Sequence, residues 1–235
     1  MIIMTSPALV GIYGGTFDPI HFGHLRVAEE LLSDIAFSRF FFVPAGTPRL
    51  RDLPFASKTQ RATMVGLAIQ DNPVFLLDTR EIKREGVSRT VETLREYRSE
   101  YGGDVALCLI MGADTFLKIH QWCDWHEVFE LCHVVIVNRP GSMLIKHKQD
   151  LPEEIQQACA SRWITCSVSL TSQPYGLIYM AATTLLDISA TQIRAMVAAK
   201  KSIRYLLPDA VSDYIKTHQL YTGEYEFKKT GQHRG

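Results

Sequence analysis

Short apolar runs alternate with amphipathic stretches along most of this chain, and the alternation restricts its fold. The apolar runs are typical of buried strands, whereas the stretches between them carry apolar residues three and four positions apart, as helices do. Strands that alternate with helices pair in parallel through right-handed crossovers. The sequence therefore predicts an α/β fold, a Rossmann-like parallel sheet with helices on both faces.

The predicted elements follow each other in a regular order. Strands are expected at residues 8–13, 39–45, 74–78, 105–111, 133–138 and 178–181. Helices are expected at residues 22–36, 57–69, 90–101, 124–132, 152–161, 190–199 and 209–218. Residues 1–221 are interpreted as a single domain with a lobe inserted at 141–175, and residues 222–235 as a flexible tail.

Composition limits which partners and which cellular compartment are expected. The 235 residues contain 25 Lys and Arg against 25 Asp and Glu, and such neutrality disfavours a nucleic-acid binder. No apolar run reaches the roughly 18 residues that span a bilayer, so no membrane partner is expected. The five cysteines form no C-x-x-C pair, which disfavours a disulfide framework or a zinc site. A cytoplasmic protein is predicted, and its oligomeric state is left open.

The segment GIYGGTFDPIHFGHL, residues 11–25, carries the strongest functional signal. A buried strand runs into Gly14 and Gly15, passes a turn, and then opens a helix with His21 and His24. Glycines allow a backbone to approach a ligand closely, and a helix N-terminus at the carboxyl edge of a parallel sheet binds anions. The histidines, three apart, are expected to face the same way in the first turn of that helix. The alternative is a tight turn with two surface histidines.

The stretch GGTFDPIHFGH resembles the signature of the nucleotidyltransferases that share the H-x-G-H motif with class I aminoacyl-tRNA synthetases. With His21 at its first position, it is similar to the bacterial-type nicotinate mononucleotide adenylyltransferases. The related phosphopantetheine adenylyltransferases usually carry Thr there. The resemblance implies a nucleotidyltransferase-type fold that binds ATP. The ATP site is expected to include Gly14, Gly15, Thr16, Phe17, His21 and His24.

A second group of residues surrounds the fourth predicted strand. Asp114 follows Gly112 at the strand end, where a carboxylate can bind ribose hydroxyls, and Trp122 offers a flat face to an aromatic ring. From the residues alone, a helix cap and core packing are the favoured roles. The resemblance implies instead that Gly112 and Asp114 lie by the nucleotide, that Thr90 holds the nicotinate carboxylate through its amide, and that Trp122 stacks on the pyridine ring.

This chain departs from the family pattern in the second group. Arg89 stands where a Tyr is usual, and Cys123 stands where an aromatic residue is common. Both departures concern the shape of the nicotinate pocket. The Arg89 side chain either adds a positive charge near the carboxylate or points to solvent.

The third group, Ile188–Arg194, reads ISATQIR. Ser189 is a plausible N-cap with Gln192 three residues on, so a simple capped helix is one interpretation. The stretch also resembles the family's Ile-Ser-Ser-Thr-x-Ile-Arg motif, which implies ATP phosphate binding by Ile188, Ser189 and Arg194.

Three further basic residues lie outside the motifs. Arg49, in a loop after a strand, is a candidate for substrate phosphate or a solvated residue. Lys58 and Arg61 are expected on a solvated helix face.

Nucleotidyl transfer to nicotinate mononucleotide mainly requires positioning and charge neutralisation. The expected mechanism is direct transfer, in which His21 and His24 stabilise the α-phosphate and Arg194 clamps the phosphate tail. Mg²⁺ is expected to arrive with ATP, without a protein metal site. The alternatives are an adenylyltransferase with another acceptor, nicotinamide mononucleotide or phosphopantetheine, and a non-catalytic nucleotide-binding module.

Overall fold

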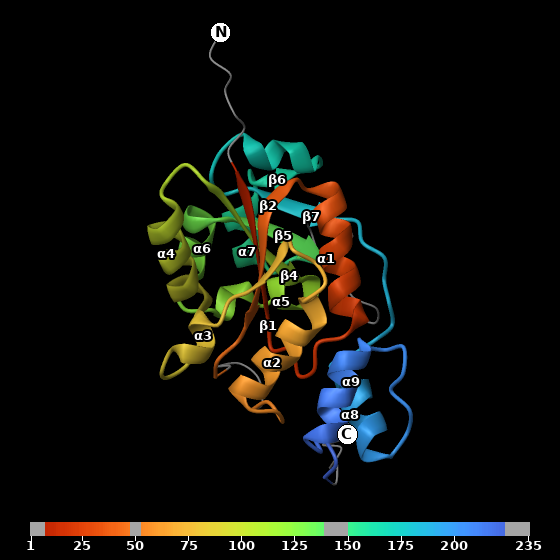
Figure 1. Ribbon diagram of the computed structural model, residues 1–235. Coiled ribbons are helices and arrows are strands. Elements are labelled where there is room, and N and C mark those ends of the chain that lie inside the picture. The colour runs from red at the N-terminus through yellow and green to blue at the C-terminus, as the bar shows by residue number, and fades with distance from the viewer. Residues whose placement is uncertain (1–7, 48–52, 139–149, 224–235) are drawn as a thin grey trace, which may run out of the picture.

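Seven parallel strands form one sheet in a computed structural model of the chain, which describes residues 8–47, 53–138 and 150–223 (Figure 1). Their order is β3-β2-β1-β4-β5-β7-β6, and every strand pairing is parallel. The strands are β1 Leu9–Gly15, β2 Phe37–Pro44, β3 Phe75–Leu77, β4 Ala106–Gly112, β5 His133–Val137, β6 Trp163–Ile164 and β7 Ile178–Ala181. The predicted α/β class is confirmed.

The helices lie close to their predicted positions. They are α1 Phe22–Asp34, α2 Lys58–Ile69, α3 Arg80–Lys83, α4 Thr90–Tyr101, α5 Ala113–Phe116, α6 Trp125–Leu131, α7 Glu153–Cys159, α8 Ala190–Ala198 and α9 Asp209–Thr217, with 3-10 turns η1 Ile119–Gln121 and η3 Ser167–Thr171. Ser57 caps α2 in a reciprocal capping box with Gln60. The one-turn helices α3 and α5 were not predicted, because four residues are too few to show a helical period.

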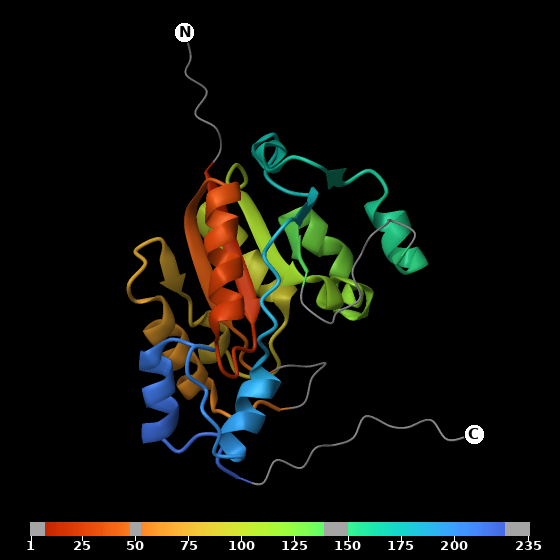
Figure 2. The same cartoon turned by 90° about the vertical axis from the view of Figure 1, so that its right-hand side faces the viewer.

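Two apolar cores hold helices against opposite faces of the sheet. Side chains of α1 and α2 pack on one face, where α9 joins the same core beside α2, and those of α4, α6 and α7 pack on the other. The two views agree on this layering (Figures 1 and 2). Neighbouring residues of β1 divide between the cores: Tyr13 belongs to the first and Ile12 to the second. This alternation is the period of two that a strand imposes.

The described part of the 141–175 region is built into the same layers. Its strand β6 pairs with β7 at the edge of the main sheet, and Ile155 and Cys159 of α7 enter the second core. Residues 139–149 lie outside the described chain. The predicted tail also lies outside it from residue 224 onward.

The carboxyl edge of the sheet gathers the elements that matter for function. Strand order changes direction between β1 and β4, which opens a crevice at the ends of those strands. Helices α8 and α9 lie beside this edge, at the end of the molecule opposite the start of β1 (Figures 1 and 2). Within the described ranges, no helix is both long enough and apolar enough to span a bilayer.

Candidate active site

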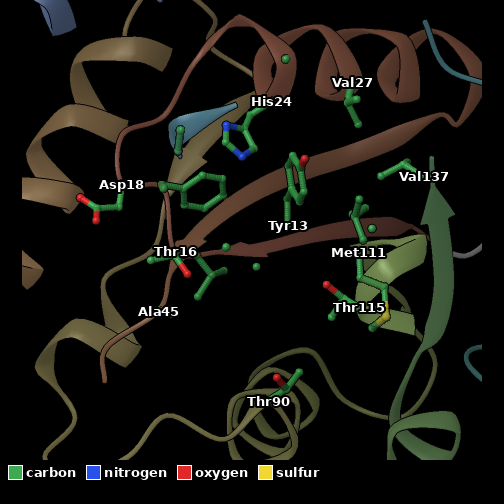
Figure 3. A pocket seen from close by; sticks show the side chains of 18 of the residues that line it. Tyr13, Thr16, Asp18, His24, Val27, Ala45, Thr90, Met111, Thr115 and Val137 are labelled. Carbon is green, nitrogen blue, oxygen red and sulfur yellow. The ribbon is translucent and has the colours of Figure 1, made fainter. Parts of the chain in front are cut away.

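A cavity of about 610 Å³ opens at the crevice between β1 and β4, a size typical of small-ligand sites (Figure 3). Most of the predicted site residues line it. These are Gly14, Gly15, Thr16, Phe17, His21, His24, Thr90, Gly112, Trp122, Ile188, Ser189 and Arg194. Asp114 is not among the lining residues, and Arg49 lies outside the described chain.

The two histidines lie together at the start of α1. Their ring centroids are 3.8 Å apart, with an angle of 34° between the ring planes. His21 is the N-cap of α1, with extended φ and ψ of −152° and 170°, so the prediction that it lies in the first helical turn is wrong. His21 is buried, whereas His24 is partly exposed to the cavity. The pair can therefore present two imidazole edges to one anionic group.

The glycine between the histidines permits this approach. A Cβ atom on Gly23 would lie 2.9 Å from Nδ1 of His21 and 3.4 Å from the carbonyl oxygen of Ile188. The first distance is shorter than side chains tolerate, so a larger residue would displace the His21 ring. The H-x-G-H spacing thus has a steric reason in this structure.

The end of β1 shapes the floor of the cavity. Gly14 faces open space, since a Cβ atom there would meet nothing within 4 Å, whereas one on Gly15 would lie 2.7 Å from the Phe17 ring. Phe17 adopts a left-handed φ of 49°, and its buried ring packs edge-on against His24 at 5.1 Å. A strained non-glycine residue is tolerated only where its surroundings hold it, and such residues cluster at functional sites. The edge-on contact of the Phe17 ring therefore helps to fix the orientation of the His24 ring.

Arg194 reaches the same loop from α8. Its Nη1 donates to the carbonyl oxygen of Asp18 at 2.6 Å, and its Nη2 donates to Oγ1 of Thr191 at 3.3 Å. Its guanidinium carbon lies 4.8 Å from the centre of the Phe55 ring. Ser189 caps α8 by accepting from the backbone N–H of Gln192 at 3.1 Å, as predicted. Arg194 and the start of α8 are thus held beside the histidines.

Arg61 is fully buried beneath this loop, so the prediction of a solvated Arg61 is wrong. Its Nη1 donates to the carbonyl of Thr16 at 2.7 Å, and its Nη2 donates to the carbonyls of Ala45 and Gly46 at 2.6 and 2.9 Å. Burial lowers the pKa of the guanidinium, and the nearby Asp18 carboxylate opposes that shift. One side chain therefore joins the loops that follow β1 and β2.

The Asp18 carboxylate is buried at the outer side of the same loop, pointing away from the His24 ring (Figure 3). It accepts the backbone N–H groups of Phe55 at 2.8 Å and Ala56 at 3.1 Å, and the hydroxyl of Tyr221 at 2.8 Å. We call Asp18, Arg61 and Tyr221 the Asp18 node. We use the name donor wall for this node together with Arg194 and the other residues between 14 and 24.

The acceptor wall consists of Glu81, Thr90 and Trp122, on the opposite side of the strand ends. Thr90 is the first residue of α4, and Figure 3 shows it across the sheet from His24. Arg89 and Cys123 also line the cavity. The Arg89 side chain is half exposed, and its Nη1 lies 3.3 Å from Oε1 of the partly exposed Glu92.

Glu81 is a buried acid that the sequence patterns missed. Its Oε1 accepts from Oγ1 of Thr93 at 2.7 Å, and burial raises the pKa of its carboxyl group. Gly46 is required nearby, because a Cβ atom there would lie 2.3 Å from the Glu81 carbonyl oxygen and 2.8 Å from Oγ of Ser88. Ser88 in turn accepts the Gly46 N–H at 2.8 Å. These contacts join the acceptor wall to the loop that Arg61 holds.

Asp114 lies in the short helix α5, whose N-cap is Gly112, so the alternative of Asp114 as the helix cap is wrong. Its Oδ1 is buried and has no hydrogen-bond partner among the described residues. Its proximity to a nucleotide stays a prediction, since its side chain does not line the cavity.

Comparison with known proteins agrees with this arrangement. Residues 12–196 match the family model described as cytidylyltransferase-like. A probable nicotinate-nucleotide adenylyltransferase of Dechloromonas aromatica is 43% identical over 218 residues, covering 93% of this chain and 99% of that protein. One of Halorhodospira halophila is 46% identical over 202 residues, covering 86% and 90%.

A solved structure shares the fold at much lower identity. The nicotinic acid mononucleotide adenylyltransferase of Plasmodium falciparum, complexed with NaAD, superposes with a TM-score of 0.68 at 17% identity, covering 91% of this chain and 97% of that one. At this identity the solved structure shows only a shared fold, whereas the sequence matches show the family. The chain belongs to the cytidylyltransferase-like family and, within it, to the nicotinate-nucleotide adenylyltransferases.

Proposed function

We propose that this protein transfers the adenylyl group of ATP to nicotinate mononucleotide, giving nicotinate adenine dinucleotide and pyrophosphate. One observation carries the proposal most directly. The His21–His24 pair, the start of α8 and Arg194 converge on one cavity whose opposite wall offers an aromatic ring and a second helix start. Such a cavity can hold two phosphorylated nucleotides with their phosphates meeting near the histidines.

The donor wall fits the polyphosphate of ATP, which is the adenylyl donor in the proposed reaction. Two helix starts, α1 and α8, adjoin the cavity, and the positive end of a helix dipole attracts anions. Arg194 adds a planar guanidinium suited to phosphate oxygens. His21 and His24 would donate hydrogen bonds to the α-phosphate as negative charge shifts during transfer. Gly14, Gly15, Thr16, Phe17 and Gly112 would shape the ATP site, and Ile188 and Ser189 would border it.

The acceptor wall fits a pyridine mononucleotide. Trp122 would stack on the ring, and Thr90 would offer its backbone N–H at the start of α4 to the carboxylate. Arg49 remains a proposed contact for the acceptor phosphate, and Asp114 a proposed neighbour of the nucleotide.

The reaction needs little covalent chemistry from the protein. A phosphate oxygen of the acceptor attacks the α-phosphorus of ATP, and the bond from that phosphorus to the bridging oxygen breaks, so pyrophosphate leaves with the electron pair. The protein holds both reactants in line and neutralises their charge. No covalent enzyme intermediate is required.

Mg²⁺ is proposed to arrive as the complex of ATP. Among the described residues, no group of three or more His, Cys, Asp or Glu side chains could hold a metal ion, and the Asp18 carboxylate is already engaged by three donors. We therefore assign no protein ligands to the ion. On the phosphates it would neutralise charge on the leaving pyrophosphate.

The cytoplasm remains the proposed compartment. All five cysteines carry free thiols, which is typical of proteins in a reducing environment.

A pyrophosphate-release assay with ATP and a panel of acceptors tests the function. Turnover with nicotinate mononucleotide, with the dinucleotide identified by mass, supports the proposal. Turnover only with nicotinamide mononucleotide or phosphopantetheine would replace it with a sibling activity. ATP binding without turnover on any acceptor would favour a binding module.

A further inference from the structure

The last described segment of the chain returns to the histidine loop. The hydroxyl of Tyr221 donates to Oδ1 of Asp18 at 2.8 Å, across 203 positions of sequence. The Tyr221 side chain is buried, and the backbone N–H of Phe22 donates to the carbonyl of Leu206 at 3.0 Å nearby. The region after α8 is therefore attached to the segment that presents His21 and His24.

Asp18 connects this attachment to the cavity on its other side. Its side chain receives Tyr221, Phe55 and Ala56, while its main-chain carbonyl receives Nη1 of Arg194 at 2.6 Å. The Phe55 ring, fixed at its backbone by Asp18, lies under the Arg194 guanidinium. Asp18 thus contacts Arg194 directly through its own carbonyl, and indirectly by fixing the backbone of Phe55, whose ring lies under the guanidinium.

Tyr221 suits this role chemically. Burial and the Asp18 carboxylate raise the pKa of its phenol, so it remains a hydrogen-bond donor across the physiological range. Oδ1 of Asp18 accepts hydrogen bonds from the Tyr221 hydroxyl and the Ala56 N–H, and loss of one leaves a buried carboxylate oxygen less satisfied. Buried networks of this kind fix one arrangement when every member is paired.

We propose that Tyr221 is a positioning residue for adenylyl transfer, acting through Asp18 to hold Arg194 in place. Tyr221 is not among the residues that line the cavity, so it acts without touching a substrate. The inference rests on the proposed function for its kinetic readout, although the contact itself does not depend on which acceptor is used.

The test compares Tyr221→Phe with Tyr214→Phe. Tyr214 lies on α9, outside the cavity, with its ring stacked on His218, so it provides a matched control. Removing one hydroxyl that supports the phosphate site is expected to lower kcat by about ten-fold, with the acceptor KM changed by less than about two-fold. Tyr214→Phe is expected to keep wild-type kcat. Thermal melts show whether each variant is folded.

A double-variant measurement separates positioning from general stability. If Tyr221 acts through Asp18, Tyr221→Phe should cost far less than ten-fold when introduced into Asp18→Asn, because the shared contact is already altered. Full additivity of the two losses would overturn the proposal. So would a Tyr221→Phe enzyme with wild-type kcat.

An acceptor-independent readout keeps the two proposals distinguishable. Calorimetric titration with a non-hydrolysable ATP analogue is expected to show about five-fold weaker binding to Tyr221→Phe, because Arg194 contacts the phosphate tail. If wild type fails to use nicotinate mononucleotide, the proposed function falls while this binding difference still decides the Tyr221 inference. Equal binding by wild type and Tyr221→Phe would count against it.

Discussion

The donor and acceptor walls of the cavity are stabilised in different ways. The donor wall depends on buried hydrogen bonds between distant segments, such as Arg61 to Thr16 and Tyr221 to Asp18. The acceptor wall has a buried hydrogen bond of its own, from Thr93 to Glu81, but α4, where Thr90 lies, packs on the second apolar core and bears exposed ion pairs such as Arg95 with Glu127. Buried polar contacts impose one geometry, whereas exposed ion pairs contribute little to the free energy of unfolding.

This difference matches what each wall must do. The donor wall must hold charged groups in a fixed arrangement around a phosphate, since preorganised dipoles and charges lower the barrier most. The acceptor wall must recognise a flat ring and a carboxylate, for which one aromatic face and one helix start suffice. Substitutions in the donor wall should therefore affect kcat, and those in the acceptor wall should affect KM.

His24→Ala should have the largest effect on catalysis. We expect kcat to fall by about 10²- to 10³-fold, because one preorganised donor to the transition state is removed. His126→Ala, an exposed histidine on α6, is the matched control and should keep wild-type kcat. Steady-state rates at saturating ATP measure both variants. Near wild-type kcat in His24→Ala would refute the role assigned to the donor wall.

Arg61→Met should have the largest effect on stability. Three backbone carbonyls would lose their donor and Asp18 its nearby positive charge, so we expect the free energy of unfolding to fall by about 3 kcal/mol. Lys58→Met, on the same helix, should change it by less than about 0.5 kcal/mol. Urea unfolding gives both values. Equal free energies of unfolding for the two variants would show that the buried Arg61 does not stabilise the loops of the donor wall.

Trp122→Ala should sharpen the distinction between the walls. Loss of ring stacking is expected to raise the KM for the acceptor by about ten-fold while the KM for ATP stays within about two-fold. Trp125→Ala, which removes an α6 tryptophan whose ring contacts that of His126, is the control. A parallel rise in both KM values would mean that Trp122 serves the whole cavity rather than the acceptor wall.

Glu81→Gln should have the smallest effect, and one that depends on pH. Burial raises the pKa of Glu81, so the folded state binds its proton more tightly than the unfolded state, whose pKa is near 4.5. This stabilisation is complete below pH 4.5 and is lost as pH rises through the folded pKa. Relative to Glu81→Gln, wild type should therefore lose stability as pH rises above about 4.5. If the stability difference between wild type and Glu81→Gln stays constant as pH rises, the pKa of Glu81 is not raised in the folded state.

Local patterns were enough to predict six of the seven strands and the longer helices, and the resemblance to a known family implied most of the predicted residues that line the cavity. The strand that ends in Gly14 and Gly15, the capped helices at Ser57 and Ser189, and the H-x-G-H spacing all act within a few residues of themselves. Such features are visible in a single sequence because the period and the cap chemistry are local.

The buried node could not be predicted in the same way. Arg61 lies among polar residues on a helix and has the pattern of a surface residue, yet the loops after β1 and β2 close over it. Asp18 read as part of a turn, and its partner Tyr221 lies 203 positions away. The one-turn helix that carries Glu81 has no measurable period. Long-range burial of charge depends on tertiary contacts, which no local pattern encodes.

The most direct test of the account is pyrophosphate release with and without nicotinate mononucleotide. If the protein only positions two bound substrates, wild type incubated with ATP and Mg²⁺ alone should release no pyrophosphate burst. Addition of the acceptor should then give pyrophosphate and nicotinate adenine dinucleotide in equal amounts. A burst of about one pyrophosphate per protein without acceptor, together with adenylate attached to the chain, would contradict direct transfer.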